Sequence, residues 1–150
     1  MRYILLAYAF MVAVLIHYFE PLRPVEINRS VISDVRCLTD NIYHEARGES
    51  RLGQLAVAQV TLNRSRLQKR SICAIVYQTN QFSWVGKVKE PNRASTLWKH
   101  IENLAKQAIE RKIVLYPLQG VTHFHTIDVL PDWAETHEFV VEIGRHRFYK

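Results

Sequence analysis

The hydrophobic pattern of this 150-residue chain changes its period once, near position 112. Before that point apolar residues recur at helical spacing, which predicts helices over residues 34–47, 53–69 and 94–111. A short helical turn over 71–77 and an irregular loop over 79–93 separate the last two. After position 112 the residues alternate over 121–126, 139–143 and 146–149, and a turn at Gly144 and Arg145 predicts a hairpin. Helices first and strands last indicate an α+β domain with a small antiparallel sheet.

Composition limits the function classes. Hydrophobic residues make up 48% and charged residues 23% of the chain, which favours a folded domain with a core over disorder. The formal net charge of +6 points to an acidic partner such as nucleic acid, anionic lipid or cell wall. Basic residues are scattered apart from one cluster over 64–70, which is typical of the solvated end of a helix. We therefore expect no nucleic-acid partner.

The N-terminus predicts a membrane segment. Residues 3–19 are apolar apart from His17, and at ~1.5 Å per residue they are just long enough to cross a thin hydrocarbon core. The bulky residues 16–19 offer no small-x-small cleavage site, which favours an uncleaved signal anchor over a removed signal peptide or a buried helix. We expect a transmembrane signal anchor over 1–20, a linker over 21–33 with Pro21 and Pro24, and a periplasmic catalytic domain over 34–150. Cys37 and Cys73 fit an oxidised pair or two buried thiols.

One carboxylate lies on the apolar face of the first predicted helix. Leu38, Ile42 and Glu45 share one side at helical spacing, and Gly48 predicts the end of the helix, with Ser33 or Asp34 as its N-cap. Burial against apolar side chains disfavours the charged form of a carboxyl and raises its pKa. A carboxyl of this kind suits a general acid near neutral pH. The alternative is a structural ion pair with Arg47, Arg51 or Arg64.

Other polar and aromatic side chains are candidates for binding. Asn63 falls on the apolar face of the second helix, so it needs hydrogen-bond partners and would either hold a loop or contact a substrate. His123 and His125 leave the same face of a strand, as zinc ligands or as polar groups lining a cleft.

The three tryptophans Trp84, Trp98 and Trp133 are either sugar-stacking platforms or core residues. Trp98 lies one residue off the apolar stripe of its helix and is expected to be partly exposed. The predicted stripe consists of Leu97, Ile101, Leu104, Ala105 and Ile109.

Five motifs in order resemble the SleB/CwlJ-type cell wall hydrolases, in the branch common in Gram-negative bacteria and their phages. They cover nearly all of residues 34–150, at 42–49 (IYHEARGE), 53–64 (GQLAVA and LNR), 75–83 (IVYQ and QFS), 122–134 (THFHT and PDWA) and 143–149 (IGRHRFY). The resemblance implies a lysozyme-like helical part joined to a small sheet. It places the family's catalytic acid at Glu45, the first Glu of Glu-Ala-Arg-Gly-Glu.

The resemblance also implies the chemistry. Family members cleave peptidoglycan glycan strands, best known as lytic transglycosylases, in which one residue protonates the glycosidic oxygen and then deprotonates the 6-hydroxyl. A muramidase, an amidase and a non-catalytic, membrane-tethered wall-binding module stay open as alternatives. Glu49 would be the local second carboxylate of a hydrolase, but we expect it to pair with Arg47 or Arg51.

We expect Glu45 to be the catalytic residue. The substrate-binding residues are expected on the motifs and the aromatic platforms: Asn63, Gln81, Phe82, Ser83, Trp84, Thr122, His123, His125 and Trp133. We expect no cofactor, no metal and a monomer whose partners are peptidoglycan and the inner membrane. A minimal catalytic domain behind one apolar helix resembles a signal-anchor phage endolysin or a small envelope-remodelling enzyme.

Overall fold

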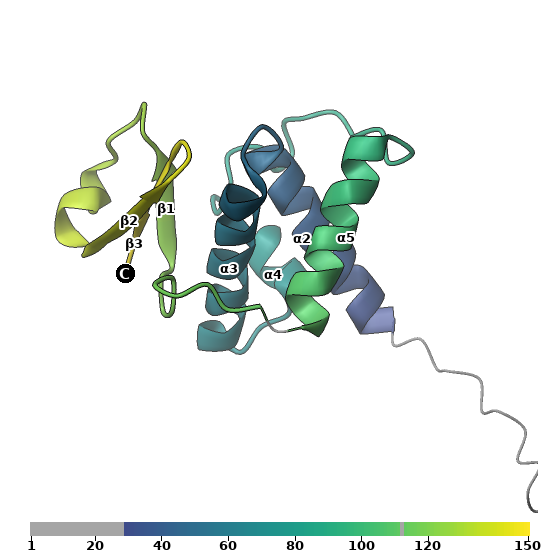
Figure 1. Cartoon of the computed structure of the whole chain (residues 1–150), viewed down its shortest axis with the longest axis horizontal. Helices are drawn as coiled ribbons and strands as arrows, with labels where there is room; N and C mark the ends of the chain where they lie inside the picture. Colours follow the sequence, from purple (N-terminus) through teal and green to yellow (C-terminus); the bar gives the residue numbers. More distant parts are fainter. Residues whose placement is uncertain (1–28, 112) are drawn as a thin grey trace, which may run out of the picture.

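The computed structural model describes residues 29–111 and 113–150 (Figure 1). Its elements, in chain order, are α2 (Arg29–Ala46), α3 (Arg51–Gln68), α4 (Ile72–Val76), α5 (Thr96–Glu110), β1 (His123–Thr126), the 3-10 helix η1 (Asp132–Thr136), β2 (Phe139–Ile143) and β3 (His146–Tyr149). Figure 1 shows the helices grouped on one side and the sheet on the other, with α3 next to the sheet. The predicted α+β class and small antiparallel sheet are confirmed.

The sheet has the order β1-β3-β2, so the last strand of the chain lies in the middle. Both pairings are antiparallel, and His123 of β1 faces Tyr149 of β3. β2 and β3 form the predicted hairpin. Its turn contains Gly144 at a φ of +58°, a left-handed conformation that glycine adopts without steric cost.

Serine N-caps set where three of the helices begin. The side chains of Ser50, Ser71 and Ser95 accept hydrogen bonds from the first turns of α3, α4 and α5. The predicted cap of α2 is wrong, because the helix is already formed at Arg29, within the range expected to be linker, and runs through Ser33 and Asp34. The Asp34 carboxylate instead accepts the backbone N–H of Cys73 at 3.3 Å.

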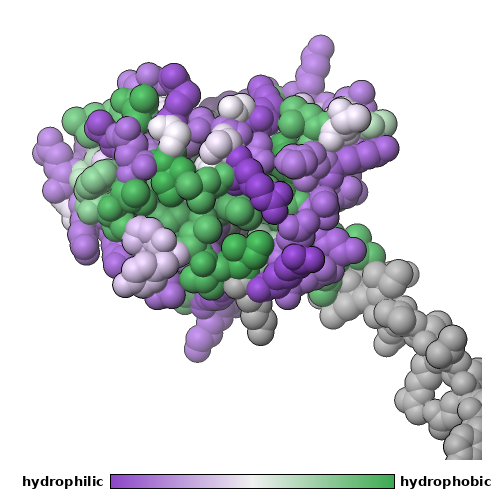
Figure 2. Space-filling view, in the orientation of Figure 1, coloured by the Kyte–Doolittle hydropathy of each residue, from purple (hydrophilic) through white to green (hydrophobic). Residues whose placement is uncertain are grey.

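The core has two apolar clusters that α3 joins. The first lies among the helices and includes the fully buried Leu38, Ile42, Val57 and Ile101. The second lies between α3 and the sheet and consists of Ala56, Val60, Leu118, Val121 and Phe148. Figure 2 shows that apolar side chains also gather at the surface between the sheet and the helices.

The orientation of α5 corrects one prediction. Trp98 is buried at 3% exposure, whereas Leu97, placed on the predicted stripe, is 41% exposed. The ring of Trp98 packs against Tyr43 of α2 at 5.4 Å, so the helix turns its largest aromatic side chain toward its neighbour. Leu67 of α3 is also outside the core, at 73% exposure.

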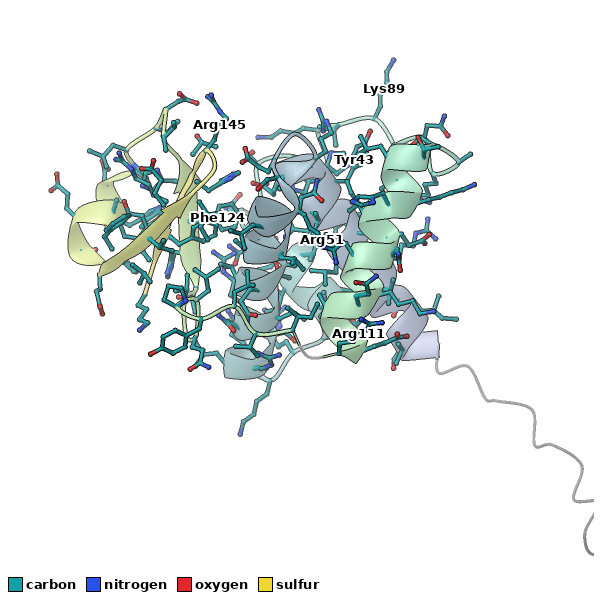
Figure 3. All side chains as sticks on the ribbon, viewed as in Figure 1. Tyr43, Arg51, Lys89, Arg111, Phe124 and Arg145 are labelled. Carbon is teal, nitrogen blue, oxygen red and sulfur yellow. A yellow bond between two sulfur atoms is a disulfide. The ribbon has the colours of Figure 1, made fainter. Side chains whose placement is uncertain are left out.

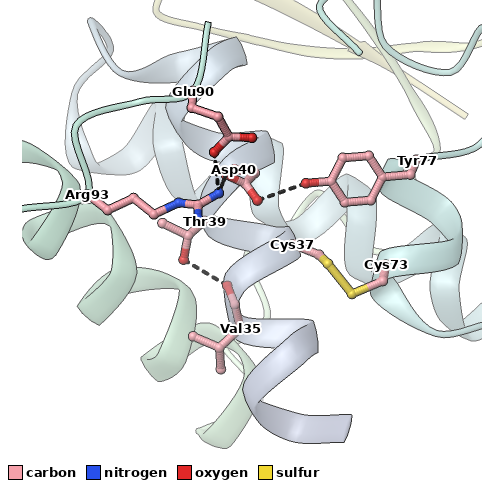
Figure 4. Close-up of polar contacts among 8 residues, drawn as sticks. All are labelled: Val35, Cys37, Thr39, Asp40, Cys73, Tyr77, Glu90 and Arg93. Carbon is pink, nitrogen blue, oxygen red and sulfur yellow. Dashed lines mark hydrogen bonds and ion pairs between the residues drawn. A yellow bond between two sulfur atoms is a disulfide. The ribbon is translucent and has the colours of Figure 1, made fainter. Parts of the chain in front are cut away.

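A disulfide between Cys37 and Cys73 joins α2 to α4 (Figure 4). On the same side of α2, the Tyr77 hydroxyl donates to the Asp40 carboxylate at 2.8 Å. Burial raises the pKa of Asp40, and the hydrogen bond from Tyr77 opposes that rise. Arg93 lies near Asp40 and pairs with Glu90 at 2.5 Å, which ties the 79–93 loop to α2.

The predicted signal anchor over 1–20 and nearly all of the linker over 21–33 lie outside the described residues. Among the helices that the structure describes, none is both long enough and apolar enough to cross a membrane.

Candidate active site

Glu45 lies in the last turn of α2, beside the buried Ile42 and Ala46. Its side chain is only partly exposed. Burial raises the pKa of Glu45 to about 7, and the nearby Arg64 guanidinium moderates the rise. The carboxyl is therefore protonated in a large fraction of molecules at neutral pH and can donate a proton.

Arg64 brings a positive charge toward Glu45 without forming an ion pair within 4 Å. It is buried on α3, its Nε donates to the Thr122 carbonyl at 2.6 Å, and its guanidinium lies 5.6 Å from the Phe82 ring centroid. Burial lowers the pKa of Arg64 to about 10, which still leaves it charged at neutral pH. Arg64 therefore acts on Glu45 through space while its own position is fixed by the chain leading into β1.

The other two arginines considered as partners for Glu45 point elsewhere. The guanidinium of Arg47 lies over the Tyr43 ring at 5.2 Å. Arg51 donates to the Gln107 side chain at 3.0 Å, between α3 and α5. Figure 3 shows Tyr43 and Arg51 on the helical side of the molecule.

Aromatic rings surround Glu45 on the side of the 79–93 loop. The indole of Trp84 stacks on His44 at 4.4 Å, and Phe82 lies 6.3 Å from Trp84. The Trp84 N–H is buried and lacks a fully formed hydrogen bond, yet its interaction with Glu45 lowers the pKa of that carboxyl slightly. Phe82 also contacts Phe124 of β1 at 6.4 Å, so the rings connect the helical part to the sheet.

His123 and His125 share one face of β1, as the alternation predicts, and Trp133 of η1 packs against both rings. Trp133 lies 5.2 Å from the His123 ring and 5.6 Å from the His125 ring. Both ring nitrogens of His125 are in use, because they contact the Thr126 carbonyl and the Tyr149 hydroxyl. His123 is more open, and burial lowers its pKa, with His137 and Arg64 adding to that effect.

The remaining predicted binding residues divide into two kinds. Asn63 and Thr122 serve the fold: the Asn63 amide donates to the carbonyls of Leu118 and Val121 at 2.8 Å each, and the Thr122 hydroxyl contacts His123. Asn63 thus holds the chain that leads into β1, as one of its two predicted roles requires. Gln81 is partly buried and Ser83 is exposed, both in the loop that carries Trp84.

Glu49 has a partner that differs from the expected one. Its Oε2 accepts the backbone N–H of Arg145 at 3.2 Å, in the β2–β3 turn, rather than pairing with Arg47 or Arg51. The turn approaches so closely that a Cβ added at Gly144 would overlap this same oxygen. Glu49 therefore connects the start of α3 to the tip of the hairpin, which Figure 3 marks at Arg145.

A metal would need at least three suitable ligands close together. Within residues 29–111 and 113–150, no three His, Cys, Asp or Glu side chains are grouped in that way.

The geometry can be compared with known proteins. A family model described as Cell Wall Hydrolase matches residues 48–149, more than half of the chain. The chain belongs to the cell wall hydrolase family. The resemblance seen in the motifs is thereby confirmed, although the matched range begins three residues after Glu45. The catalytic role of Glu45 stays a prediction.

Curated relatives of this cell wall hydrolase include two spore cortex-lytic enzymes. That of Oceanobacillus iheyensis is 27% identical over 122 residues, which cover 79% of this chain and 42% of the relative. That of Bacillus cereus is 26% identical over 122 residues, covering 79% and 44%. The chain thus matches less than half the length of these relatives.

Two solved structures show the fold. The catalytic domain of the germination-specific lytic transglycosylase SleB from Bacillus anthracis matches with a TM-score of 0.65 at 23% identity, over 85% of this chain and 99% of that one. The catalytic domain of Bacillus cereus SleB matches with a TM-score of 0.57 at 22% identity, over 85% and 94%. The expected lysozyme-like helical part with a small antiparallel sheet is confirmed.

Sequence reasoning left several residues of this site without a role. His44 follows Asp40 by four positions, a helical spacing that places both on one face, and it stacks on Trp84. Burial lowers the pKa of His44, and Asp40 opposes that effect. His137 directly follows η1, and its ring lies 4.3 Å from the His123 ring. No local pattern in the sequence predicts this contact.

Proposed function

We propose that this cell wall hydrolase cleaves the glycan strands of peptidoglycan as a lytic transglycosylase, with Glu45 as both acid and base. The observation that carries the proposal is a half-buried carboxyl whose pKa is raised to about 7 by burial, set among aromatic rings. A single group that must donate and then accept a proton works best when its pKa is near the working pH.

The proposed reaction needs only one carboxyl. Protonated Glu45 gives its proton to the glycosidic oxygen, and the bond from that oxygen to C1 of the muramic acid breaks. The Glu45 carboxylate then takes the proton of the 6-hydroxyl on the same sugar, whose oxygen bonds to C1 and closes a 1,6-anhydro ring. Glu45 ends the cycle protonated, and no water is consumed.

A muramidase is the second candidate within the same substrate class. Such a hydrolase ordinarily uses a second carboxyl at a defined separation. Two carboxyls close to Glu45 in the sequence have other contacts: Glu49 accepts the Arg145 N–H, and Asp40 accepts the Tyr77 hydroxyl. This engagement of both carboxyls supports the single-carboxyl reaction.

Digestion of purified sacculi with the full-length protein in detergent tests the proposal. Mass analysis of the soluble products is expected to give anhydro-muropeptides. Reducing-end muropeptides would replace the transglycosylase with a muramidase, and free stem peptides would replace it with an amidase. Retention on sacculi without any release of products would instead indicate a wall-binding module.

We also propose that the domain works in the periplasm, held to the inner membrane by the apolar segment at 3–19, as in an envelope-remodelling enzyme or a signal-anchor endolysin of a phage. The Cys37–Cys73 disulfide supports an oxidising compartment, because such bonds rarely persist in the cytosol. A periplasmic phosphatase fused after Lys150 is expected to be active. Activity of a cytosolic reporter in its place would contradict this topology.

A further inference from the structure

A pocket of about 470 Å³ lies beside α3, away from the aromatic rings around Glu45. The C-terminal half of α3 and the chain that leads into β1 form its walls. The lining residues are Gln59, Asn63, Arg66, Leu67, Val114, Gln119, Gly120 and Thr122. Figure 1 shows this chain crossing the lower end of α3 before it turns up into β1. The volume is within the range of pockets that hold small ligands.

The pocket shares a wall with the Glu45 site. Thr122 lines the pocket, and its carbonyl accepts the Nε of Arg64 at 2.6 Å. Arg64 in turn is the cation that acts on Glu45. Thr122 and Arg64 therefore connect the pocket to the surroundings of Glu45.

Two polar groups in the pocket lack partners. Gln59 is 2% exposed and its Nε2 donates to Asn63, but its Oε1 has no hydrogen-bond partner among residues 29–111 and 113–150. The Arg66 side chain is exposed, and its guanidinium makes no ion pair or hydrogen bond with the residues that the structure describes. The Gln59 oxygen is buried, so the accessible polar group is the Arg66 guanidinium, a cation for a carboxylate.

The rest of the lining favours a small aliphatic group. Leu67 is 73% exposed and Val114 is 45% exposed at the pocket. None of the lining residues is aromatic, whereas sugar rings are commonly held by stacking on aromatic side chains. The lining therefore suits a peptide with a free carboxylate and short alkyl side chains better than it suits a sugar.

We propose that this pocket binds the acidic stem peptide carried by the muramic acid next to the bond that is cleaved. The inference rests on the proposed function, because it takes peptidoglycan as the substrate. Stem peptides contain amide N–H groups, free carboxylates and alanine methyl groups. The free carboxylates match the Arg66 guanidinium, and the methyl groups match the apolar pair Leu67 and Val114.

The first test is direct binding. Wild-type protein in detergent is titrated with a free stem tetrapeptide, which contains no glycosidic bond, and binding is followed by chemical-shift changes. Saturable shifts that include Gly120 and Thr122 are expected. Arg66→Ala is expected to weaken this binding about two- to fivefold, the loss typical of one exposed charged contact. Leu67→Glu places a like charge against the peptide and is expected to cost about tenfold or more.

The second test compares kcat/KM on peptide-bearing glycan strands with kcat/KM on strands stripped of peptide. The ratio is expected to exceed one in the wild type and to fall in Arg66→Ala and Leu67→Glu. Lys99→Ala removes one positive charge from the exposed face of α5, outside the pocket, and serves as the matched control. Its ratio is expected to equal that of the wild type.

The outcomes separate this inference from the proposed function. Peptide binding that weakens in Arg66→Ala supports the pocket even if no glycan is cleaved. Glycan cleavage with no detectable peptide binding, and with an equal ratio in all variants, overturns the pocket and leaves the transglycosylase intact. A ratio that falls equally in Lys99→Ala would show a general charge effect and would also overturn the pocket.

Discussion

The helical part and the sheet part of this cell wall hydrolase are stabilised in different ways. The helices share a large apolar cluster and a disulfide, whereas the sheet is attached to them by a smaller cluster and by individual hydrogen bonds. Asn63 and Arg64 donate to main-chain carbonyls of the segment that leads into the sheet. Glu49 accepts a main-chain N–H of the hairpin. The Glu45 carboxyl thus belongs to the firmly packed part, whereas the sheet is positioned by a few polar contacts. Substitutions in the two parts should accordingly have different effects.

The largest effect is expected from Glu45→Gln. The amide keeps the shape of the side chain but cannot donate a proton, so turnover should fall by ~10² or more while the circular dichroism spectrum is unchanged. Product release from sacculi measures turnover. Glu49→Gln is the matched control, since its amide oxygen can still accept the Arg145 N–H. An equal loss in Glu49→Gln would indicate two reacting carboxyls.

Breaking the disulfide should weaken the helical part. The double variant Cys37→Ser, Cys73→Ser frees a loop closed over a sequence separation of 36, and the expected loss in the free energy of unfolding is about 2–4 kcal/mol. Urea denaturation with and without reductant measures it. Reductant should destabilise the wild type and leave the double variant unaffected. Equal midpoints for all samples would mean that the bond contributes nothing.

The buried charge of Glu45 should make stability depend on pH. The pKa of Glu45 is about 7 in the folded protein and near 4.5 in the unfolded chain. The contribution of this carboxyl to the free energy of unfolding is therefore complete below pH 4.5 and is lost as the pH rises through 7. Glu45→Gln removes this loss. The variant should therefore gain up to about 3 kcal/mol over the wild type between pH 4.5 and pH 8. Parallel stability curves for the two proteins would contradict the raised pKa.

Glu49→Ala should loosen the sheet while leaving the Glu45 side chain in place. It removes the acceptor of the Arg145 N–H, and losing a hydrogen bond to a charged group costs about 1–3 kcal/mol. Hydrogen exchange should accelerate in β2 and β3 more than in α2 and α5. Uniform acceleration of exchange throughout the domain would mean that the sheet and the helices unfold together.

The smallest effect is expected from chelation. If His123 and His125 contact substrate rather than zinc, exhaustive EDTA treatment should leave glycan cleavage unchanged. Loss of activity with recovery on addition of Zn²⁺ would require the ion to activate water.

Local patterns predicted the elements well because each depends on nearby residues. Helical spacing placed Glu45 beside Leu38 and Ile42, and alternation placed His123 and His125 on one face of β1. In α5 the predicted stripe holds at Ile101, Leu104 and Ala105 but fails in the first turn. Adjacent residues on a helix differ by about 100°, and only the neighbouring α2 decides whether Leu97 or Trp98 turns inward.

Contacts between distant segments could not be read from the sequence. Glu49 and Arg145 are 96 residues apart, and the acceptor bonds a main-chain N–H, which every residue but proline offers. The pairing of Cys37 with Cys73 was open for a similar reason, since two cysteines alone do not reveal whether their Cα atoms lie within reach.

At Gly144 only a hydrogen atom fits where another residue would carry its Cβ, because the Glu49 carboxylate lies so close. Any larger substituent there would collide with the Glu49 carboxylate, and the left-handed backbone adds a further cost for other residues. The Glu49 carboxylate would have to turn away and give up its hydrogen bond from the Arg145 N–H. The missing side chain at Gly144 thus leaves room for the contact that holds the hairpin to α3, so Gly144→Ala would loosen this attachment without altering any other side chain of the sheet.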